Sequence, residues 1–363
     1  MSPVTGPIAL SAFIEVPYRL YRDDACWVPP RRGDCRRLLD RRRNRFFEYG
    51  DVGLFVARRG RTVLGRIAAI HNRRHPCEGF FGQFECVDDL AAARALFRAA
   101  GEWLGERGLS SMLGPVNLTT NDECGTLMEG FHLPPALLTA YNPPYHQALL
   151  RGCGLTKAKD LYSWEWMAEG SRFPASVGRI AARAERGGVT VRHVDLSDFR
   201  AELERVRTLV NLSLGANWGF QPFSDREFDE LALRLRPWLR PEFLLIAEVG
   251  GRPAGTALGV PDVNRALAAA RGALPGTGLL RILRAARRID HGRFLLMGVL
   301  PEHRLRGVEA LLLARLEAAA RQAGLRSVEI SWTLEDNHHL NRAFERFGCR
   351  RTKVHRLWHR DLC

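Results

Sequence analysis

A short turn in the last third of the chain carries residues suited to holding a phosphate group. The apolar run Phe294–Leu300 is typical of a buried strand, and Pro301 ends it. The turn that follows contains two arginines and a glycine: Arg304, Arg306 and Gly307. From Val308 onward, apolar residues recur at helical spacing. A helix start offers unpaired N–H groups and the positive end of its dipole, and glycine lets a phosphate approach the backbone. The stretch therefore predicts a phosphate site.

Three carboxylates are candidates for a general base. Asp122 and Glu123 belong to the polar run 114–125, GPVNLTTNDECG. Because Asn, Asp and Thr also form turns, a hydrogen-bonded turn is the alternative for this run. Glu329 lies in a predicted strand, where alternation places it on the face opposite its apolar neighbours. A solvated surface carboxylate is the alternative there.

Polar and aromatic residues in three segments are candidates for contact with an acceptor substrate. We expect this role for Asn117, Asn121, Tyr141, Asn217, Trp218 and Phe220. The alternative for the aromatic residues is that they cover the end of a sheet.

The composition is that of a globular protein with room for two domains. The chain has 363 residues, of which 46% are hydrophobic and 26% charged. No apolar run approaches the roughly 18 residues of a spanning helix. Met1-Ser2-Pro3 does not resemble the start of a signal peptide, and the eight cysteines form no C-x-x-C pair. We therefore expect reduced cysteines and a cytoplasmic location.

The net charge of +14 favours anionic partners. Arginine-rich codon usage alone would also produce such a charge. The segment 278–288 sets four Leu or Ile residues against four arginines, which suits peripheral contact with an anionic membrane. Packing on its own domain and forming the wall of an acyl groove are the alternatives. We expect no nucleic acid partner and no metal, since His71 and His75 lack a third ligand.

An internal repeat organises the chain. Leu54–Gly60 aligns with Leu244–Gly250, and each predicts a strand, a glycine turn and a returning strand. The predicted fold is α/β with mixed sheets, in two copies at 1–168 and 189–363. A mixed helical linker at 169–188 joins them, and the second copy carries an insertion at about 261–293. The first copy has three acidic residues in place of the phosphate turn, so we expect only the second to bind the phosphate.

Two motifs in the second copy resemble those of the GNAT superfamily of acyl-CoA transferases. Arg304–Glu309 resembles the pyrophosphate loop Arg/Gln-x-x-Gly-x-Gly/Ala, although Glu309 departs from it. Asn337–Gly348 resembles the helix Asn-x-x-Ala-x-x-Leu-Tyr-x-x-x-Gly, with Phe344 where the family often has a proton-donating Tyr. The resemblance implies acyl-CoA as a substrate, with no permanently bound cofactor. It assigns coenzyme A binding to Met297, Val299, Arg304, Arg306, Gly307, Val308 and Asn337.

Three further segments resemble a narrower group of two-copy GNAT proteins. They are Pro17–Tyr21, Trp27–Pro30 and Asn44–Phe47. The group includes bacterial ceramide synthases, so the resemblance implies transfer of a fatty acyl group from acyl-CoA to a long-chain sphingoid amine. A small-molecule or protein acetyltransferase and a non-catalytic acyl-CoA-binding protein are the alternatives.

Overall fold

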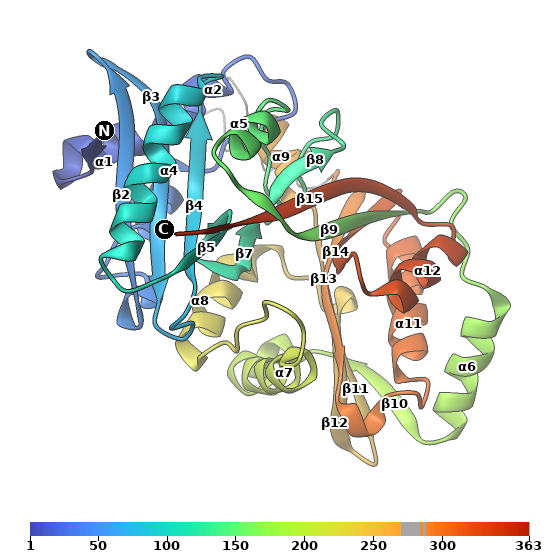
Figure 1. The fold of residues 1–363 in the computed structure, drawn as a ribbon. Coiled ribbons are helices and arrows are strands. Elements are labelled where there is room, and N and C mark those ends of the chain that lie inside the picture. The colour runs from blue at the N-terminus through green and yellow to red at the C-terminus, as the bar shows by residue number, and fades with distance from the viewer. Residues whose placement is uncertain (270–283, 286–287, 363) are drawn as a thin grey trace. The chain divides into compact units, whose positions relative to one another are not determined.

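The computed structural model describes residues 1–269, 284–285 and 288–362 of the chain. They form two compact units, Met1–Leu161 with Lys353–Cys363 and Tyr162–Thr352. Strand β9 (Thr156–Met167) begins in the first unit and ends in the second, and β15 (Arg350–Asp361) returns. The mixture of helices with parallel and antiparallel strands confirms the predicted α/β class (Figure 1).

The first unit is built on a sheet with the order β1-β2-β3-β4-β5-β15. Its strands are β1 (Ser2–Pro3), β2 (Gly50–Arg59), β3 (Thr62–Asn72), β4 (Gly79–Cys86) and β5 (Ser111–Gly114). Strands β2, β3 and β4 are antiparallel, whereas β4 and β5 are parallel. Helix α4 (Leu90–Gly105) covers one face of this sheet (Figure 1). Its Leu96 and Phe97 are fully buried and pack in one cluster with Phe81 of β4.

Short helices cover the other face of the first unit. Phe13 and Ile14 of α1 pack against Val56 and Val63 of the sheet. The remaining elements of the unit are α1 (Gly6–Ile14), α2 (Val16–Leu20), α3 (Arg32–Leu38), η1 (Arg45–Glu48), β6 (Val116–Asn117), β7 (Thr119–Cys124), β8 (Thr126–Glu129) and α5 (His146–Gly152).

The second unit has the strand order β9-β14-β13-β12-β11-β10. Its strands are β10 (Val189–His193), β11 (Leu244–Val249), β12 (Arg252–Pro261), β13 (His291–Val299) and β14 (Ser327–Leu334). Its helices are α6 (Ala175–Arg186), α7 (Phe199–Leu214), α8 (Asp225–Leu235), α9 (Val263–Ala269), α11 (Val308–Gln322) and α12 (His338–Arg346). Short turns of 3-10 helix lie at η2 (Leu196–Asp198), η3 (Arg236–Trp238), η4 (Pro241–Phe243) and η5 (Pro301–His303).

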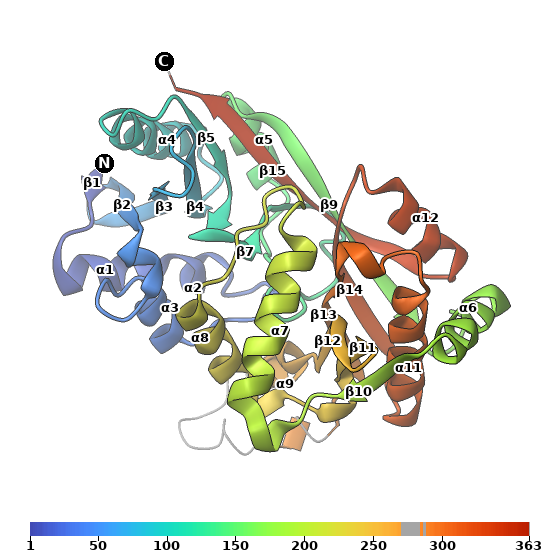
Figure 2. The ribbon, with the colours of Figure 1, turned by 90° about the horizontal axis from the view of Figure 1, so that it is seen from below.

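Helices α7 and α11 lie on opposite faces of the second sheet (Figure 2). On the α11 face, Val308, Leu311 and Leu312 pack against Ala247, Ala257 and Val299 of the strands and against Ala181 and Ala184 of α6. Residues 169–188, expected as a mixed helical linker, contain α6, and this helix packs in the core of the second unit.

The predicted hairpins of the repeat are confirmed. In the first copy Ala57 lies opposite Gly65, and in the second Ala247 lies opposite Gly255. A register shift follows at the same point in each hairpin. The two copies thus share a local irregularity as well as their strand order.

The amphipathic part of the insertion lies largely outside the described residues. Strand β12 ends at Pro261, α9 follows, and β13 begins at His291. Leu279, Leu280, Ile282 and Leu283 are not among the described residues, so the membrane-contact prediction stays a prediction. Among the helices that are described, none combines the length and the apolar character needed to cross a bilayer.

Candidate functional site

Strand β13 of the second unit has an edge that is only partly paired. Within the described part of the chain, β13 pairs with β14 from His291–Ser327 to Phe294–Ile330, and the ladder stops there. On its other side, β13 stays paired with β12 as far as Val299. We call residues 295–299 on the β14 side the unpaired edge of β13. Its backbone groups are free of a strand ladder, so an extended ligand can pair with them.

A β-bulge lies at the start of this edge. Leu258 pairs with Leu296 and Gly259 with Phe294, so Leu295 is the extra residue. A bulge takes a residue out of the ladder and redirects its backbone groups. The regular pairing of β13 with β12 is therefore interrupted at Leu295, where the unpaired edge begins.

The predicted phosphate turn has the expected geometry. Gly307 has φ +86° and forms the N-cap of α11, where it contributes no side chain. A Cβ at this position would lie 3.0 Å from Ile180 Cγ2 and 3.1 Å from Ala184 Cβ of α6, which is a second reason for glycine. Leu305 also has positive φ, +61°, and is fully exposed. The first N–H groups of α11 are thus left facing a turn that carries exposed Arg306.

The two arginines of the turn have different surroundings. The guanidinium of Arg304 donates from Nη2 to the Ser213 carbonyl at 2.8 Å and from Nε to the Val299 carbonyl at 3.1 Å. Arg304 therefore ties the turn to β13 and to α7. The contacts that we predict between coenzyme A and Arg304, Arg306, Met297, Val299 and Val308 stay predictions.

Asn337 caps α12, since its Oδ1 accepts from the N–H of Leu340 at 3.3 Å.

In the first copy, the position equivalent to the unpaired edge is filled by the chain itself. The pairing of β4 with β5 ends at Phe80–Leu113, and the hairpin β6–β7 follows along β4. A Cβ on Gly82 would lie only 1.8 Å from the Val116 carbonyl oxygen. The helix start is filled as well, because Asp89 Oδ1 accepts from the N–H of Ala92 at 3.0 Å. The polar run 114–125 thus occupies the place that stays open in the second copy.

Several of the predicted site residues meet in the first unit. Asn117 Nδ2 donates to Glu123 at 3.1 Å, and Asn117 Oδ1 accepts from Gln83 Nε2 at 2.7 Å. Thr119 Oγ1 donates to Asp122 at 3.0 Å, and the N–H of Asn121 donates to Thr119 Oγ1 at 3.3 Å. Glu123 and Asp122 are both half-buried. These bonds fit the turn interpretation, and the catalytic assignments stay predictions.

Glu85 of β4 is the centre of a buried polar cluster in this unit. Tyr21, 1% exposed, donates its hydroxyl to Glu85 Oε2. Arg66, 6% exposed, lies opposite Glu85 in the sheet, with Nη2 4.0 Å from Oε1. The ring of Tyr141 packs edge-on against that of Tyr21, with the ring centroids 6.1 Å apart, and the Tyr141 hydroxyl donates to Asp24 Oδ2 at 2.8 Å.

Burial raises the pKa of Glu85 to about 7, from an ordinary value of 4.5. The charge of Arg66 and the hydrogen bond from Tyr21 oppose this rise, and the negative charge of Glu123 adds to it. Glu85 is thus a carboxylate whose proton exchanges near neutral pH, a property of groups that transfer protons.

Sequence reasoning did not assign a site role to Tyr21, Arg66 or Glu85. One signal was present: Arg66 interrupts the apolar strand TVLGRIAAIHN, and an arginine that is buried in a strand needs a charged partner. The identity of that partner depends on the register between β3 and β4.

Val328 and Ile330 of β14 pack on the α11 face of the second sheet, and Glu329 between them lies on the other face, toward α7. This confirms the predicted alternation. Its Oε1 is 3.5 Å from Nη1 of Arg293, the residue paired with it across the ladder. Both side chains are largely buried, with 13% and 5% exposed. Glu329 therefore lies beside the start of the unpaired edge.

The predicted substrate residues of the second unit lie in the segment between α7 and α8. Asn217 and Trp218 are exposed, and Phe220 is half-buried against Phe223 with ring centroids 6.0 Å apart. Their contact with an acceptor stays a prediction.

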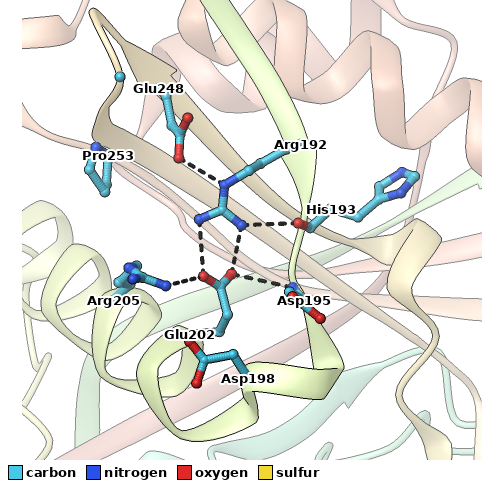
Figure 3. Close-up of a pocket in the computed structure, with 9 residues that line it drawn as sticks. Arg192, His193, Asp195, Asp198, Glu202, Arg205, Glu248 and Pro253 are labelled. Atoms are coloured by element: carbon cyan, nitrogen blue, oxygen red, sulfur yellow. Dashed lines mark hydrogen bonds and ion pairs between the residues drawn. The ribbon is translucent and has the colours of Figure 1, made fainter.

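A pocket of about 460 Å³ at the start of α7 holds a network of charges (Figure 3). Glu202, 2% exposed, accepts from Arg192 at 2.7 and 3.0 Å and also from Arg205. Arg192 bonds Glu248 as well, at 2.8 Å. Burial would raise the pKa of Glu202, but the bonds from Arg192 and Arg205 lower it below its ordinary range. With its oxygens so engaged, Glu202 is suited to hold α7 against β10 and β11 and not to transfer protons.

Comparison with known proteins places the chain in a family. Residues 203–349 match the model of the Acetyltransferase (GNAT) family. A relative from Caulobacter vibrioides (strain NA1000 / CB15N) is 31% identical over 372 residues, which cover 99% of this chain and 97% of the relative. The chain belongs to the GNAT family and is an acyl-CoA-dependent N-acyltransferase.

The Caulobacter relative is named bacterial ceramide synthase. A second relative, Protein YghO of Escherichia coli (strain K12), is 30% identical, with 97% of this chain and 93% of the relative covered. Among solved structures, a tandem GNAT protein from the clavulanic acid biosynthesis pathway matches with a TM-score of 0.55 and 16% identity. The match covers 98% of this chain and 95% of the clavulanic acid pathway protein, and it confirms the tandem GNAT fold.

Proposed function

We propose that this protein transfers a fatty acyl group from acyl-CoA to the amine of a long-chain, sphingoid-type lipid base. The observation that carries the proposal is the full-length similarity to the Caulobacter protein named bacterial ceramide synthase. The first unit supports it too, because the relative's similarity extends over both units and is not confined to the acyl-CoA-binding copy.

In this proposal the second copy binds the thioester. The pyrophosphate lies at the start of α11, beside Arg306 and the N–H groups that follow Gly307. The pantetheine arm pairs with the backbone of Met297 and Val299 along the unpaired edge of β13. The thioester carbonyl then lies near the bulge at Leu295, whose backbone N–H stabilises the oxyanion.

A carboxylate takes a proton from the substrate ammonium, directly or through water, and the free amine attacks the thioester carbon. The C–N bond forms, the C–S bond breaks, and coenzyme A leaves as a thiolate. Glu329 and Glu123 remain the candidate bases, and Asp122 is the alternative in the polar run. The attacking nitrogen loses its second proton as the amide forms, and the thiolate takes up a proton. Phe344, 2% exposed, has no proton to give, so this proton comes from another group or from water.

We also propose that the protein meets its lipid substrate at an anionic membrane surface in the cytoplasm. Its net charge of +14 favours such a surface, and each arginine near anionic lipid contributes about 1 kcal/mol. The segment 278–288, most of which lies outside the described residues, is the part that we expect to make this contact.

The test is a panel of acyl-CoAs and amines incubated with purified protein and read by mass spectrometry, with and without anionic vesicles. We expect N-acylated sphingoid base from long-chain acyl-CoA, and more of it on vesicles. Glu329→Gln and Glu123→Gln identify the base, whose loss costs ~10²–10⁴-fold in rate. Faster turnover of acetyl-CoA with soluble amines would contradict the lipid proposal and favour a small-molecule acetyltransferase.

A further inference from the structure

The two faces of the second sheet differ in polarity where β13 and β14 separate. The last two ladder pairs are Arg293–Glu329 and Phe294–Ile330. The first pair is charged and lies on the α7 face, whereas Phe294 and Ile330 line an apolar cavity on the α11 face. A chain that follows the unpaired edge from Val299 toward Phe294 meets a closed ladder there. It must turn to one face or the other.

The cavity on the α11 face has a volume of about 60 Å³. Its lining is mainly aromatic and aliphatic, with Trp166, Phe173, Phe243, Leu316, Ala320 and Val328 among its residues. Arg293 also borders it, as the residue of β13 between the lining residues Gly292 and Phe294, although its side chain pairs with Glu329 at 3.5 Å. Glu317 of α11 borders it as well and pairs with Arg321 at 2.9 Å. The described residues of its lining therefore offer apolar surface, and the two charged ones among them are both in ion pairs.

A second, open hollow of about 640 Å³ adjoins the cavity. The two share Phe173 and Glu317 as lining residues. A chain that is too long for the apolar cavity can extend into this hollow between α11 and residues 168–173.

We infer that the acyl chain of the bound thioester turns to the α11 face and enters this apolar cavity, while the acceptor amine approaches from the α7 face, beside Glu329. The inference rests on the proposed function for the position of the thioester. Transfer from water favours an apolar chain on the apolar face. An ammonium is stabilised by the carboxylate on the other face. The polarity of the two faces thus assigns a side to each substrate, and makes Ala320 and Leu316 determinants of chain length.

The experiment compares the binding of octanoyl-CoA and acetyl-CoA by isothermal titration, so that it requires no turnover. Ala320 is 4% exposed and lines the cavity, so a larger side chain there would take up cavity volume. We expect Ala320→Leu to lower the octanoyl-to-acetyl affinity ratio at least tenfold and to leave acetyl-CoA affinity within twofold. An unchanged ratio in a folded Ala320→Leu protein overturns the inference.

If Ala320→Leu fails to fold, a second pair of variants tests whether the acyl chain occupies the cavity. Leu316→Ala enlarges the cavity, and Leu312→Ala makes the same change at a buried position of α11 that does not line it. We expect the ratio to change in Leu316→Ala and to stay at the wild-type value in Leu312→Ala. Equal ratios in both variants overturn the inference. Failure of the proposed function would appear separately, as normal binding ratios with no N-acylated product.

Discussion

At the scale of single residues, Glu85 is the group that we expect to make the stability of the fold depend on pH. Its carboxyl is held by Tyr21 and lies across the sheet from Arg66, yet burial outweighs both and raises its pKa to about 7. Below pH 4.5 the carboxyl is protonated in both the folded and the unfolded chain. Between about pH 4.5 and 7 the folded protein holds a proton that the unfolded chain has lost, so stability falls as pH rises through this window.

Glu85→Gln should remove this dependence. We expect the free energy of unfolding of the wild type to fall by about 3 kcal/mol relative to that of the variant between pH 4 and pH 8, because the pKa of Glu85 is about 7 in the folded chain and 4.5 ordinarily. Urea denaturation at several pH values measures it. Parallel pH profiles for the two proteins would contradict the predicted proton uptake. Glu78→Gln is a control, since it removes another carboxyl of the same unit whose pKa burial raises less.

At the scale of elements, α7 is placed by two sets of contacts. At its start, Glu202 joins Arg192 of β10, which also bonds Glu248 of β11. At its end, the Ser213 carbonyl accepts from Arg304, and a Cβ on Gly298 of β13 would lie 1.9 Å from Ser213 Oγ. The helix thereby connects the charge network in Figure 3 to the phosphate turn.

Glu202→Gln should loosen the start of α7. The variant loses the charge that Arg192 and Arg205 share, and hydrogen bonds to charged groups contribute about 1.5–3 kcal/mol. We expect a loss of about 2 kcal/mol in the free energy of unfolding, together with faster amide exchange in α7. Glu204→Gln, at an exposed position of the same helix, should change stability by less than about 0.5 kcal/mol. Equal stabilities of the two variants would show that the network does not hold the helix.

At the scale of the whole molecule, two copies of one unit have taken different roles. Matching hairpins, with Gly65 and Gly255 at the same register shift, lead to different strand edges. One edge is covered by residues 114–117, and the other is unpaired. We therefore expect one acyl-CoA site per chain.

Titration with coenzyme A should give one molecule bound per chain, in the second copy. Arg306→Glu should weaken binding roughly tenfold, because it places a negative charge beside the phosphates. Arg326→Glu makes the same charge change beyond the opposite end of α11 and should leave the affinity within about twofold. A stoichiometry of two, or equal losses in both variants, would contradict the assignment.

The sequence by itself determined the repeat, the hairpins and the glycine turn before α11, because these depend on local rules. Strand alternation, helical spacing and positive φ at glycine act over a few residues. Alternation also fixed the face of Glu329. The family followed from motifs of the same local kind.

Only the tertiary structure decided which polar residues meet. The Glu85 cluster depends on the register of β3 with β4 and on the packing of α2, neither of which is encoded by neighbours in sequence. The run 114–125 reads as polar in sequence, but its position along β4 is what fills the first copy's strand edge. The apolar cavity, likewise, exists only where Phe294, Leu316 and Ile330 from separate elements converge. Burial and long-range pairing determine these features. The free energy of burying a charge, or of leaving a cavity in the core, depends on the residues that surround it in the folded protein.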